Sequence, residues 1–342
     1  MAPPSGHRVA RVTTIAATAA VAYLSCGRRL GSSAVPSALR TTWVGPAVAL
    51  RSNRRSTLRA AAPSATPEAD PATEPADPAD ARPVVAVVGA GGRTGALVVD
   101  ALLKAGARPR ALTRTGQWSS PSKAQEEVEV GQADVTDAAS LAAAVAGASA
   151  VVFAAAFSRG KSLPKDVDNA GLVRTARAAQ EQGVGRLVVV SSAATTRPYA
   201  PVGVLLNTVG SGVLLEKLKG ESEMRGILRG TGTTYTIIRP GGLKTGEASG
   251  FSALEFNQGD THVGSVQRAD VAAVCAAVAT DPENRGAGKT FEMYEAQSRN
   301  GLLPWYGEPK YAVAGRGDCG EMLGALLDDE EVTDVPGFLP FS

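Results

Sequence analysis

The strongest constraint on the fold is a regular alternation of strand-like and helix-like segments. Residues 84–88 (VVAVV) are apolar and mostly β-branched, as expected of a strand buried on both faces of a sheet. Each later strand-like run is separated from the next by a helix-like segment or a loop, and parallel pairing requires such crossovers. We therefore predict a doubly wound, mainly parallel, Rossmann-like α/β fold in a single domain. The expected strands cover residues 84–88, 108–113, 128–130, 150–155, 186–191, 234–239 and 290–294, and the expected helices 96–105, 137–146, 169–182, 213–229 and 268–280.

Composition divides the remainder of the chain. Residues 1–67 contain nine arginines and no acid, with an uncharged, mostly apolar stretch at 12–26 followed by Arg, Ser and Ala. This pattern predicts a targeting presequence, signal-like and then transit-like. Residues 68–83 repeat Pro, Ala and acids and are expected to form a disordered linker. The predicted Rossmann-like domain spans 84–295, and 296–342 form a C-terminal extension that either wraps the domain or docks on a partner.

The order of the two leader segments bears on location. A signal-like segment before a transit-like one resembles the bipartite presequence of algae with complex plastids, and a simple plastid presequence is the nearest alternative. A mitochondrial presequence is less favoured. A basic tail that contacts nucleic acid or a membrane surface is the remaining alternative. The sequence thus predicts import into a plastid.

Charge and composition exclude several functions. Of the formal net charge of +2, residues 1–67 carry +9 and residues 68–82 carry −4, which leaves −3 on residues 83–342. A mildly acidic domain does not support nucleic-acid binding through a basic surface. No uncharged apolar run reaches the roughly 20 residues of a membrane span, so no transmembrane segment is expected in the mature chain. Two histidines and three cysteines exclude a multi-histidine or thiolate zinc site.

A glycine-rich turn, GAGGRTG, lies between the first expected strand and the first expected helix. Glycines in this context permit a tight turn and let the backbone approach a diphosphate, which the free N–H groups of the helix N-terminus then bind. A purely structural turn is the alternative. The residues expected to bind the cofactor here are Gly89, Gly91, Gly92, Arg93, Thr94 and Gly95.

Two further residues specify the adenosine end of the nucleotide. Arg114 follows the second strand, where an NAD-binding protein usually carries an acid for the ribose hydroxyls. A guanidinium there pairs with a 2′-phosphate, and Arg93 could flank the same group, so NADP(H) is favoured over NAD(H). Both arginines could instead be solvated surface charges. Asp134 is placed to accept from the adenine amino group, or is simply an acid at the start of a helix.

Five segments together resemble the atypical short-chain dehydrogenase/reductases with NAD(P)-binding, NmrA-like domains, and among these the plastid members most closely. The likeness covers roughly residues 84–295 and implies a Rossmann-like fold that binds a nicotinamide nucleotide. The segments are GAGGRTG at 89–95, GQADVTDAASL at 131–141, RLVVVSSAATTRP at 186–198, YTIIRPGGL at 235–243 and QRADVAAVC at 267–275.

The resemblance also implies catalytic positions. Active members use a serine, a tyrosine and a lysine, with the tyrosine four residues before the lysine. Ser191 and Ser192 match the serine, and Lys217 matches the lysine or could hold the nicotinamide ribose hydroxyls; a solvated helix lysine is the alternative. The tyrosine is missing, because Val213 stands four residues before Lys217, and Tyr199 precedes the helix.

Two functions therefore remain. One is NADPH-dependent reduction or epimerisation of a small carbonyl metabolite in a plastid. The other is a non-catalytic NADP(H)-binding redox sensor or scaffold subunit of a plastid complex. Outside these sites we expect Cys275 to be packed and Asp270 to be structural. Residues 286–290 (GAGKT) lack the glycine that a phosphate loop needs and should precede an edge strand.

Overall fold

The computed structural model describes residues 82–119, 127–199, 203–204, 207–208, 210–262, 264–298 and 311–332. The predicted presequence and residues 68–81 of the predicted linker lie outside these ranges. No helix in the described part of the chain is long and apolar enough to cross a bilayer.

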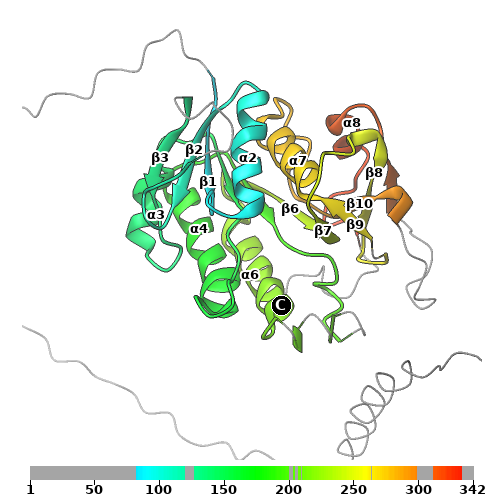
Figure 1. The fold of residues 1–342 in the computed structure, drawn as a ribbon, viewed down its shortest axis with the longest axis horizontal. Coiled ribbons are helices and arrows are strands. Elements are labelled where there is room, and N and C mark those ends of the chain that lie inside the picture. Colours follow the sequence, from blue (N-terminus) through cyan, green and yellow to red (C-terminus); the bar gives the residue numbers. More distant parts are fainter. Residues whose placement is uncertain are drawn as a thin grey trace, which may run out of the picture. The chain divides into compact units, whose positions relative to one another are not determined.

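The core of the fold is a nine-stranded, mainly parallel sheet in the order β11-β8-β10-β6-β5-β4-β1-β2-β3 (Figure 1). The seven strands from β10 to β3 are parallel, whereas β8 pairs antiparallel with both β10 and β11. The predicted doubly wound α/β fold is confirmed. The strands are β1 (Val84–Val88), β2 (Arg108–Thr113), β3 (Glu129–Gln132), β4 (Ala150–Phe153), β5 (Arg186–Val190), β6 (Thr234–Pro240), β8 (Leu254–Gln258), β10 (Lys289–Glu295) and β11 (Tyr311–Ala314). A separate pair comprises β7 (Gly242–Lys244) and β9 (Ser265–Gln267).

Helices cover both faces of the sheet, and β1 shows why. Val85 and Val87 belong to one hydrophobic cluster, with side chains of α2 (Arg93–Lys104) and α7 (Arg268–Thr280). Ala86 and Val88 belong to a second cluster, which contains side chains of the helices on the opposite face. Because successive side chains of a strand point to opposite faces of the sheet, β1 contributes to both clusters. The second layer consists of α3 (Ala138–Val145), α4 (Ala170–Glu181) and α6 (Val213–Leu228) (Figure 1).

The expectation of an edge strand at 290–294 is wrong. Strand β10 lies between β6 and β8, and β11 forms the edge. The sequence analysis did not predict β8, because only Leu254 and Phe256 of its five residues are apolar, although all five are buried, Asn257 and Gln258 included. A search for apolar runs does not find a strand of this kind, because its buried side-chain amides are stabilised by hydrogen bonds to distant residues.

Residues 311–332 wrap the domain. They supply β11 and the short helix α8 (Cys319–Gly324), which packs against α7. The buried Lys289 Nζ donates to the carbonyl oxygens of Leu323 (3.0 Å) and Leu326 (2.9 Å). These contacts fasten the end of α8 and the residues that follow it to β10.

Cys275 and Asp270, for which the sequence predicted a role in the fold and none in the reaction, are both buried. Cys275 is fully buried on α7, and burial raises the pKa of its thiol far above the ordinary value. Asp270, also buried, accepts from the backbone N–H groups of Ser249 (3.0 Å) and Gly250 (2.9 Å). Asp270 thus ties the loop that follows β7 to the first turn of α7.

Candidate functional site

The glycine turn folds tightly against neighbouring backbone. Gly89 has φ of 86°, in the left-handed region, and its N–H donates to the Leu112 oxygen of β2 (3.2 Å). A Cβ at Gly89 would lie 2.7 Å from the Ala155 nitrogen, and one at Gly95 would lie 2.2 Å from the Gly89 oxygen. These two glycines are therefore required by the turn itself and by the close packing of β1, β4 and α2.

Gly91 has a different surrounding. A Cβ there would meet only the Thr113 methyl group, at an ordinary contact distance of 3.7 Å. The next residue, Gly92, is the N-cap of α2 and has no side-chain cap, and the first turn carries no acid. The missing Cβ of Gly91 thus leaves a cradle beside uncapped backbone N–H groups at a helix N-terminus, which fits the diphosphate of a dinucleotide. Arg93 and Thr94 form the first turn of α2.

The loop after β2 is bonded to the glycine turn through the side chain of Trp118. The indole Nε1 of the buried Trp118 donates to the Ala90 oxygen (3.2 Å), and Thr113 Oγ1 donates to the Gln117 oxygen (3.0 Å). Sequence analysis missed Trp118, because an isolated aromatic residue in a loop carries no periodic signal. Its bond fixes the carbonyl at the centre of the glycine turn.

Arg114 and Asp134 lie together at the carboxyl ends of β2 and β3. Asp134 Oδ1 accepts from the backbone N–H of Thr136 (2.8 Å) and from its hydroxyl (2.7 Å). These two bonds lower the pKa of Asp134, and the charges of Arg114 and Arg174 lower it further. The exposed guanidinium of Arg114 is thus within electrostatic reach of the Asp134 carboxylate.

Arg93 has another neighbour. It is exposed, and its charge adds to the effect of burial in lowering the pKa of Arg268 at the start of α7. Arg268 Nη1 itself donates to the Lys244 oxygen (3.2 Å) and to Thr245 Oγ1 (2.9 Å). Arg93 therefore lies toward α7, whereas Arg114 lies beside Asp134.

Lys217 is not a solvated helix lysine. It is buried on α6, with its Nζ 2.8 Å from Oδ1 of the fully buried Asp168. Asp168 lies in a π-helical turn, η2 (Lys165–Asn169), and its Oδ2 accepts from the Phe157 N–H after β4 (3.0 Å). Sequence analysis missed Asp168, since only the packing of η2 on α6 reveals its partner.

The two serines after β5 point to different partners. Ser191 is partly exposed, and its hydroxyl donates to Oε1 of the fully buried Glu221 on α6. Ser192 Oγ donates instead to the Ala193 oxygen (3.0 Å). Of the predicted serines, Ser191 is therefore the one tied to α6.

A small hollow brings several of these side chains together at the carboxyl ends of β4 and β5. No tyrosine lines it, and Tyr199, the nearest candidate in the sequence, is 82% exposed. The hollow therefore contains a serine, a lysine and two carboxylates in place of the serine, tyrosine and lysine of active family members. Its polar lining residues are Asp168, Ser191, Lys217 and Glu221.

Behind Ser191 lies a buried network of charges. Arg239 of β6 is fully buried between two fully buried carboxylates, with Nη2 2.5 Å from Glu221 Oε2 and Nη1 3.4 Å from Glu292 Oε1. Burial raises the pKa of Glu221, but the guanidinium groups of Arg239 and Arg225 outweigh it and hold that pKa below its ordinary value. For Glu292, burial and the nearby charge of Asp260 raise the pKa to about 8.

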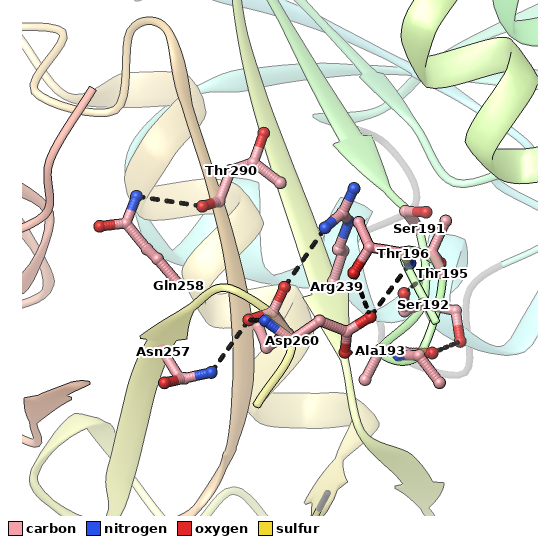
Figure 2. A network of polar contacts seen from close by, with 12 residues as sticks. Ser191, Ser192, Ala193, Thr195, Thr196, Arg239, Asn257, Gln258, Asp260 and Thr290 are labelled. Carbon is pink, nitrogen blue, oxygen red and sulfur yellow. Dashed lines mark hydrogen bonds and ion pairs between the residues drawn. The ribbon is translucent and has the colours of Figure 1, made fainter. Parts of the chain in front are cut away.

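Asp260 connects this network to the loop after β5 (Figure 2). Its backbone N–H donates to Glu292 Oε2 (2.8 Å). Its carboxylate accepts from the N–H groups of Ala194 (2.7 Å) and Thr196 (3.1 Å) and from the Thr196 hydroxyl (2.8 Å). The loop that carries Ser191 and Ser192 is thereby anchored to β10. No group of His, Cys, Asp or Glu suited to a metal ion occurs among the residues that the structure describes.

Comparison with known proteins agrees with this geometry. A family described as NAD(P)H-binding matches residues 89–282, from the glycine turn to just past α7. An uncharacterised chloroplastic protein of Arabidopsis thaliana is 34% identical over 200 residues, which span 56% of this chain and 69% of the relative. The chloroplastic Protein TIC 62 of Pisum sativum is 28% identical over 181 residues, 47% of this chain but only 33% of that protein.

A solved structure extends the likeness to three dimensions. A Bacillus halodurans protein, provisionally assigned as an NAD-dependent epimerase/dehydratase, is similar with a TM-score of 0.51 and 26% identity over 62% of this chain and 94% of that one. The fold thus has a counterpart in a protein provisionally assigned as an NAD-dependent epimerase/dehydratase. The chain belongs to the NAD(P)H-binding family of atypical short-chain dehydrogenase/reductases, and its relatives include chloroplastic proteins.

Proposed function

We propose that the protein binds NADP(H) in preference to NAD(H) and uses it to reduce or epimerise a small carbonyl metabolite in a plastid. The observation that carries the proposal is the open cradle at Gly91 and the uncapped start of α2, with Arg114 beside Asp134 one strand away. A diphosphate at the cradle brings the adenosine toward the ends of β2 and β3. There Arg114 would pair with the 2′-phosphate and Asp134 would accept from the adenine amino group.

The remaining predicted residues have roles along the same path. Gly89, Gly91, Gly92, Thr94 and Gly95 would shape the cradle. The N–H groups of Gly89 and Gly92 are bonded within the turn region, to the oxygens of Leu112 and Gly89, so the first turn of α2 would present its backbone N–H groups to the diphosphate. Arg93, whose neighbour is Arg268 and not Asp134, is assigned to the diphosphate as well. Lys217 would donate to the nicotinamide ribose hydroxyls, with Asp168 holding its ammonium in place.

A bound nicotinamide would supply hydride exchange with a substrate carbon. The chain's own residues would then orient the substrate oxygen and handle its proton. Ser191 and Lys217 line one hollow at the carboxyl ends of the parallel strands, where ligands of doubly wound folds bind. These two residues are our candidates for contact with the substrate oxygen, and Ser192, which follows Ser191 in the chain, is the third candidate.

Two observations support a plastid location. The sequence relatives described above are chloroplastic proteins. The basic, acid-free residues 1–67 have the composition of a presequence. Expression of the full chain with a fluorescent protein at its C-terminus should give fluorescence inside plastids, and deletion of residues 1–67 should abolish import.

The missing tyrosine supports a second candidate function, a non-catalytic NADP(H)-binding sensor or scaffold subunit of a plastid complex. No tyrosine lines the hollow, so the usual proton donor of the superfamily is absent from it. On this alternative the protein would bind NADP(H) and pass the nucleotide state to a partner protein instead of a substrate.

One experiment separates the two functions. The full chain is titrated with NADPH and NADH by calorimetry and then mixed with NADPH and a panel of aldehydes, ketones and quinones. Tighter binding of NADPH than NADH, with NADPH oxidation above background, is the expected result. Tight binding without oxidation across the panel would favour the sensor or scaffold, and failure to bind either nucleotide would contradict both functions.

A further inference from the structure

Arg93 and Arg268 are the first residues of two neighbouring helices, α2 and α7. The helices contribute side chains to one hydrophobic cluster and lie side by side on the same face of the sheet (Figure 1). Helix α2 leads to the start of β2, and the end of α7 is bonded to Arg186 at the start of β5, whose Nη1 donates to the Asp281 oxygen (2.9 Å). Both helices therefore run back along parallel strands, and both begin at the carboxyl edge of the sheet. Arg93 and Arg268 lie at that same edge.

Neither arginine has a carboxylate partner. Arg93 is exposed and Arg268 is only 8% exposed, and neither forms an ion pair with any residue that the structure describes. Nη1 of Arg268 donates to the Lys244 oxygen (3.2 Å) and to Thr245 Oγ1 (2.9 Å), whereas no described residue bonds its Nε or Nη2. Asp270, the acid closest to Arg268 along the chain, accepts instead from two backbone N–H groups of the loop after β7. The bonds of Arg268 thus fasten it to the end of β7 but leave its charge uncompensated.

A cation that is shielded from water is stable only beside a negative charge. Arg268 has a second cation in its surroundings instead, because burial lowers the pKa of its guanidinium and the charge of Arg93 lowers it further. Two such charges repel each other until an anion binds between them. Two guanidinium groups offer N–H donors in a planar arrangement that matches the oxygens of a carboxylate or a phosphate. The pair is therefore suited to an oxyanion.

The place of Arg268 separates this anion from the phosphates of the nucleotide. Its bonds fix it to residues that follow β6, and the strand order puts β4 and β5 between β6 and β1. Neighbouring strands lie about 4.8 Å apart, so the end of β6 is about 14 Å from the glycine turn after β1. A nicotinamide that extends from the cradle over β4 and β5 leaves Arg268 beyond it, on the side of the substrate. Arg93 reaches toward Arg268 from the cradle.

We propose that Arg268, with Arg93 beside it, binds a carboxylate or phosphate group of the substrate. This inference rests on the proposed function and names its substrate class, a carbonyl metabolite that carries an acidic group. Bidentate bonds from Arg268 would fix the orientation of that group and so turn the carbonyl carbon toward the nicotinamide. Neither arginine would take part in hydride or proton transfer. Their contribution is to affinity, and they favour an acid over its neutral analogue.

The test measures anion binding after the nucleotide phosphates have occupied their own sites. The full chain is saturated with NADP⁺ and titrated by calorimetry, at constant ionic strength, with inorganic phosphate and with matched pairs of carbonyl compounds. The pairs are dihydroxyacetone phosphate with dihydroxyacetone, and 4-oxopentanoate with its methyl ester. We expect phosphate to bind to the NADP⁺ complex, and the charged member of at least one pair to bind at least about tenfold more tightly than the neutral member.

Substitutions of the two arginines locate the site. Arg268→Met and Arg93→Met should each weaken phosphate binding to the NADP⁺ complex about tenfold or more and remove the preference for the charged compound. Thr245→Val is the matched control, because it removes a bond to Arg268 and keeps both charges, and its phosphate affinity should equal that of wild type. Arg268→Lys, which keeps a charge without the planar fork, should restore part of the affinity. Arg93→Met carries the test if Arg268→Met does not fold, because the Arg93 side chain is exposed.

The outcomes separate this inference from the proposed function. Absence of phosphate binding to the NADP⁺ complex overturns the inference and leaves the proposed function standing. Phosphate that binds only to the nucleotide-free protein, and that NADP⁺ displaces, has the same meaning, because the two arginines then belong to the nucleotide site. Wild-type phosphate affinity in both arginine variants also overturns the inference. Failure of NADP⁺ itself to bind contradicts the proposed function, and the inference falls with it.

Discussion

Two regions of the molecule hold their arginines in opposite ways. Near the glycine turn and the carboxyl end of β2, Arg93 and Arg114 are exposed, and neither forms an ion pair within the part of the chain that the structure describes. Beyond β5, Arg239 is fully buried between Glu221 and Glu292. A buried charge is stable only when paired, whereas an exposed one remains hydrated and free to exchange water for a ligand. The first arrangement suits binding of an anion, and the second suits a fixed geometry behind a reacting group.

The same substitution made in both regions tests most directly whether the buried and the exposed arginines differ in their contribution to stability. Arg239→Met takes the cation away from Glu292 and leaves the buried carboxylate of Glu221 with the more distant Arg225 (3.7 Å), so we expect it to lower the free energy of unfolding by about 3–5 kcal/mol. Arg114→Met removes only an exposed charge and should change stability by less than about 0.5 kcal/mol. Urea unfolding of both variants measures the difference. Equal, small losses would show that the buried network contributes no more than a surface charge.

The glycines of the turn offer a second contrast, inside the nucleotide region. Gly95→Ala would place a Cβ 2.2 Å from the Gly89 oxygen and should destabilise the protein by about 3 kcal/mol. Gly91→Ala meets only an ordinary contact, so its stability should stay near that of wild type. Its Cβ should nevertheless occupy the diphosphate cradle and weaken NADPH binding at least about tenfold. Thermal unfolding and calorimetry on both variants separate the two roles, and full NADPH affinity in folded Gly91→Ala would argue against the cradle.

The third test concerns the pH dependence of the buried network. Three groups face Glu292, namely Arg239 Nη1, the Asn257 side-chain amide and the backbone N–H of Asp260, whose carboxylate adds negative charge. A carboxyl group whose pKa rises to about 8 on folding contributes stability at low pH, and this contribution is lost as pH rises from the ordinary value of 4.5 through 8.

Glu292→Gln removes that titration. The difference in unfolding free energy between the variant and wild type should therefore shift in favour of the variant by a few kcal/mol between about pH 5 and about pH 9. Urea midpoints measured across this range report the slope, and any constant offset between the two proteins is irrelevant. A difference that does not change with pH would mean that Glu292 is ionised throughout.

The last prediction, with the smallest expected effect, concerns how Arg114 and Arg93 contribute to nucleotide affinity. Arg114→Met should weaken NADPH binding about tenfold and leave NADH binding unchanged, because NADH has no 2′-phosphate for Arg114 to pair with. Arg93→Met should weaken both nucleotides equally, since Arg93 lies toward Arg268 and not toward Asp134. Calorimetry with both nucleotides measures the two ratios. A loss confined to NADPH in Arg93→Met would place Arg93 on the 2′-phosphate beside Arg114.

Local sequence predicted the first βαβ unit well. The run at 84–88, the glycines that follow it and the next strand lie close together in the chain, so their relative positions follow from one βαβ unit. The same reasoning located Ser191 at the end of β5 and Lys217 on α6. The reasoning failed for Asp168, Glu221, Arg239 and Glu292, which come from four separate elements and show no spacing that marks them as partners.

Local patterns in the chain were enough to predict the class of fold and the glycine turn after β1, because the periodicity of apolar residues and the chemistry of glycine turns act over short distances along the chain. The surroundings of the serine and the lysine follow instead from the packing of segments that are far apart in the chain. Asp168 meets Lys217, and Glu221 meets Ser191 and Arg239, where η2, α6 and β6 converge. These charges need partners because they are buried away from water. The identity of each partner cannot be predicted from the sequence around it.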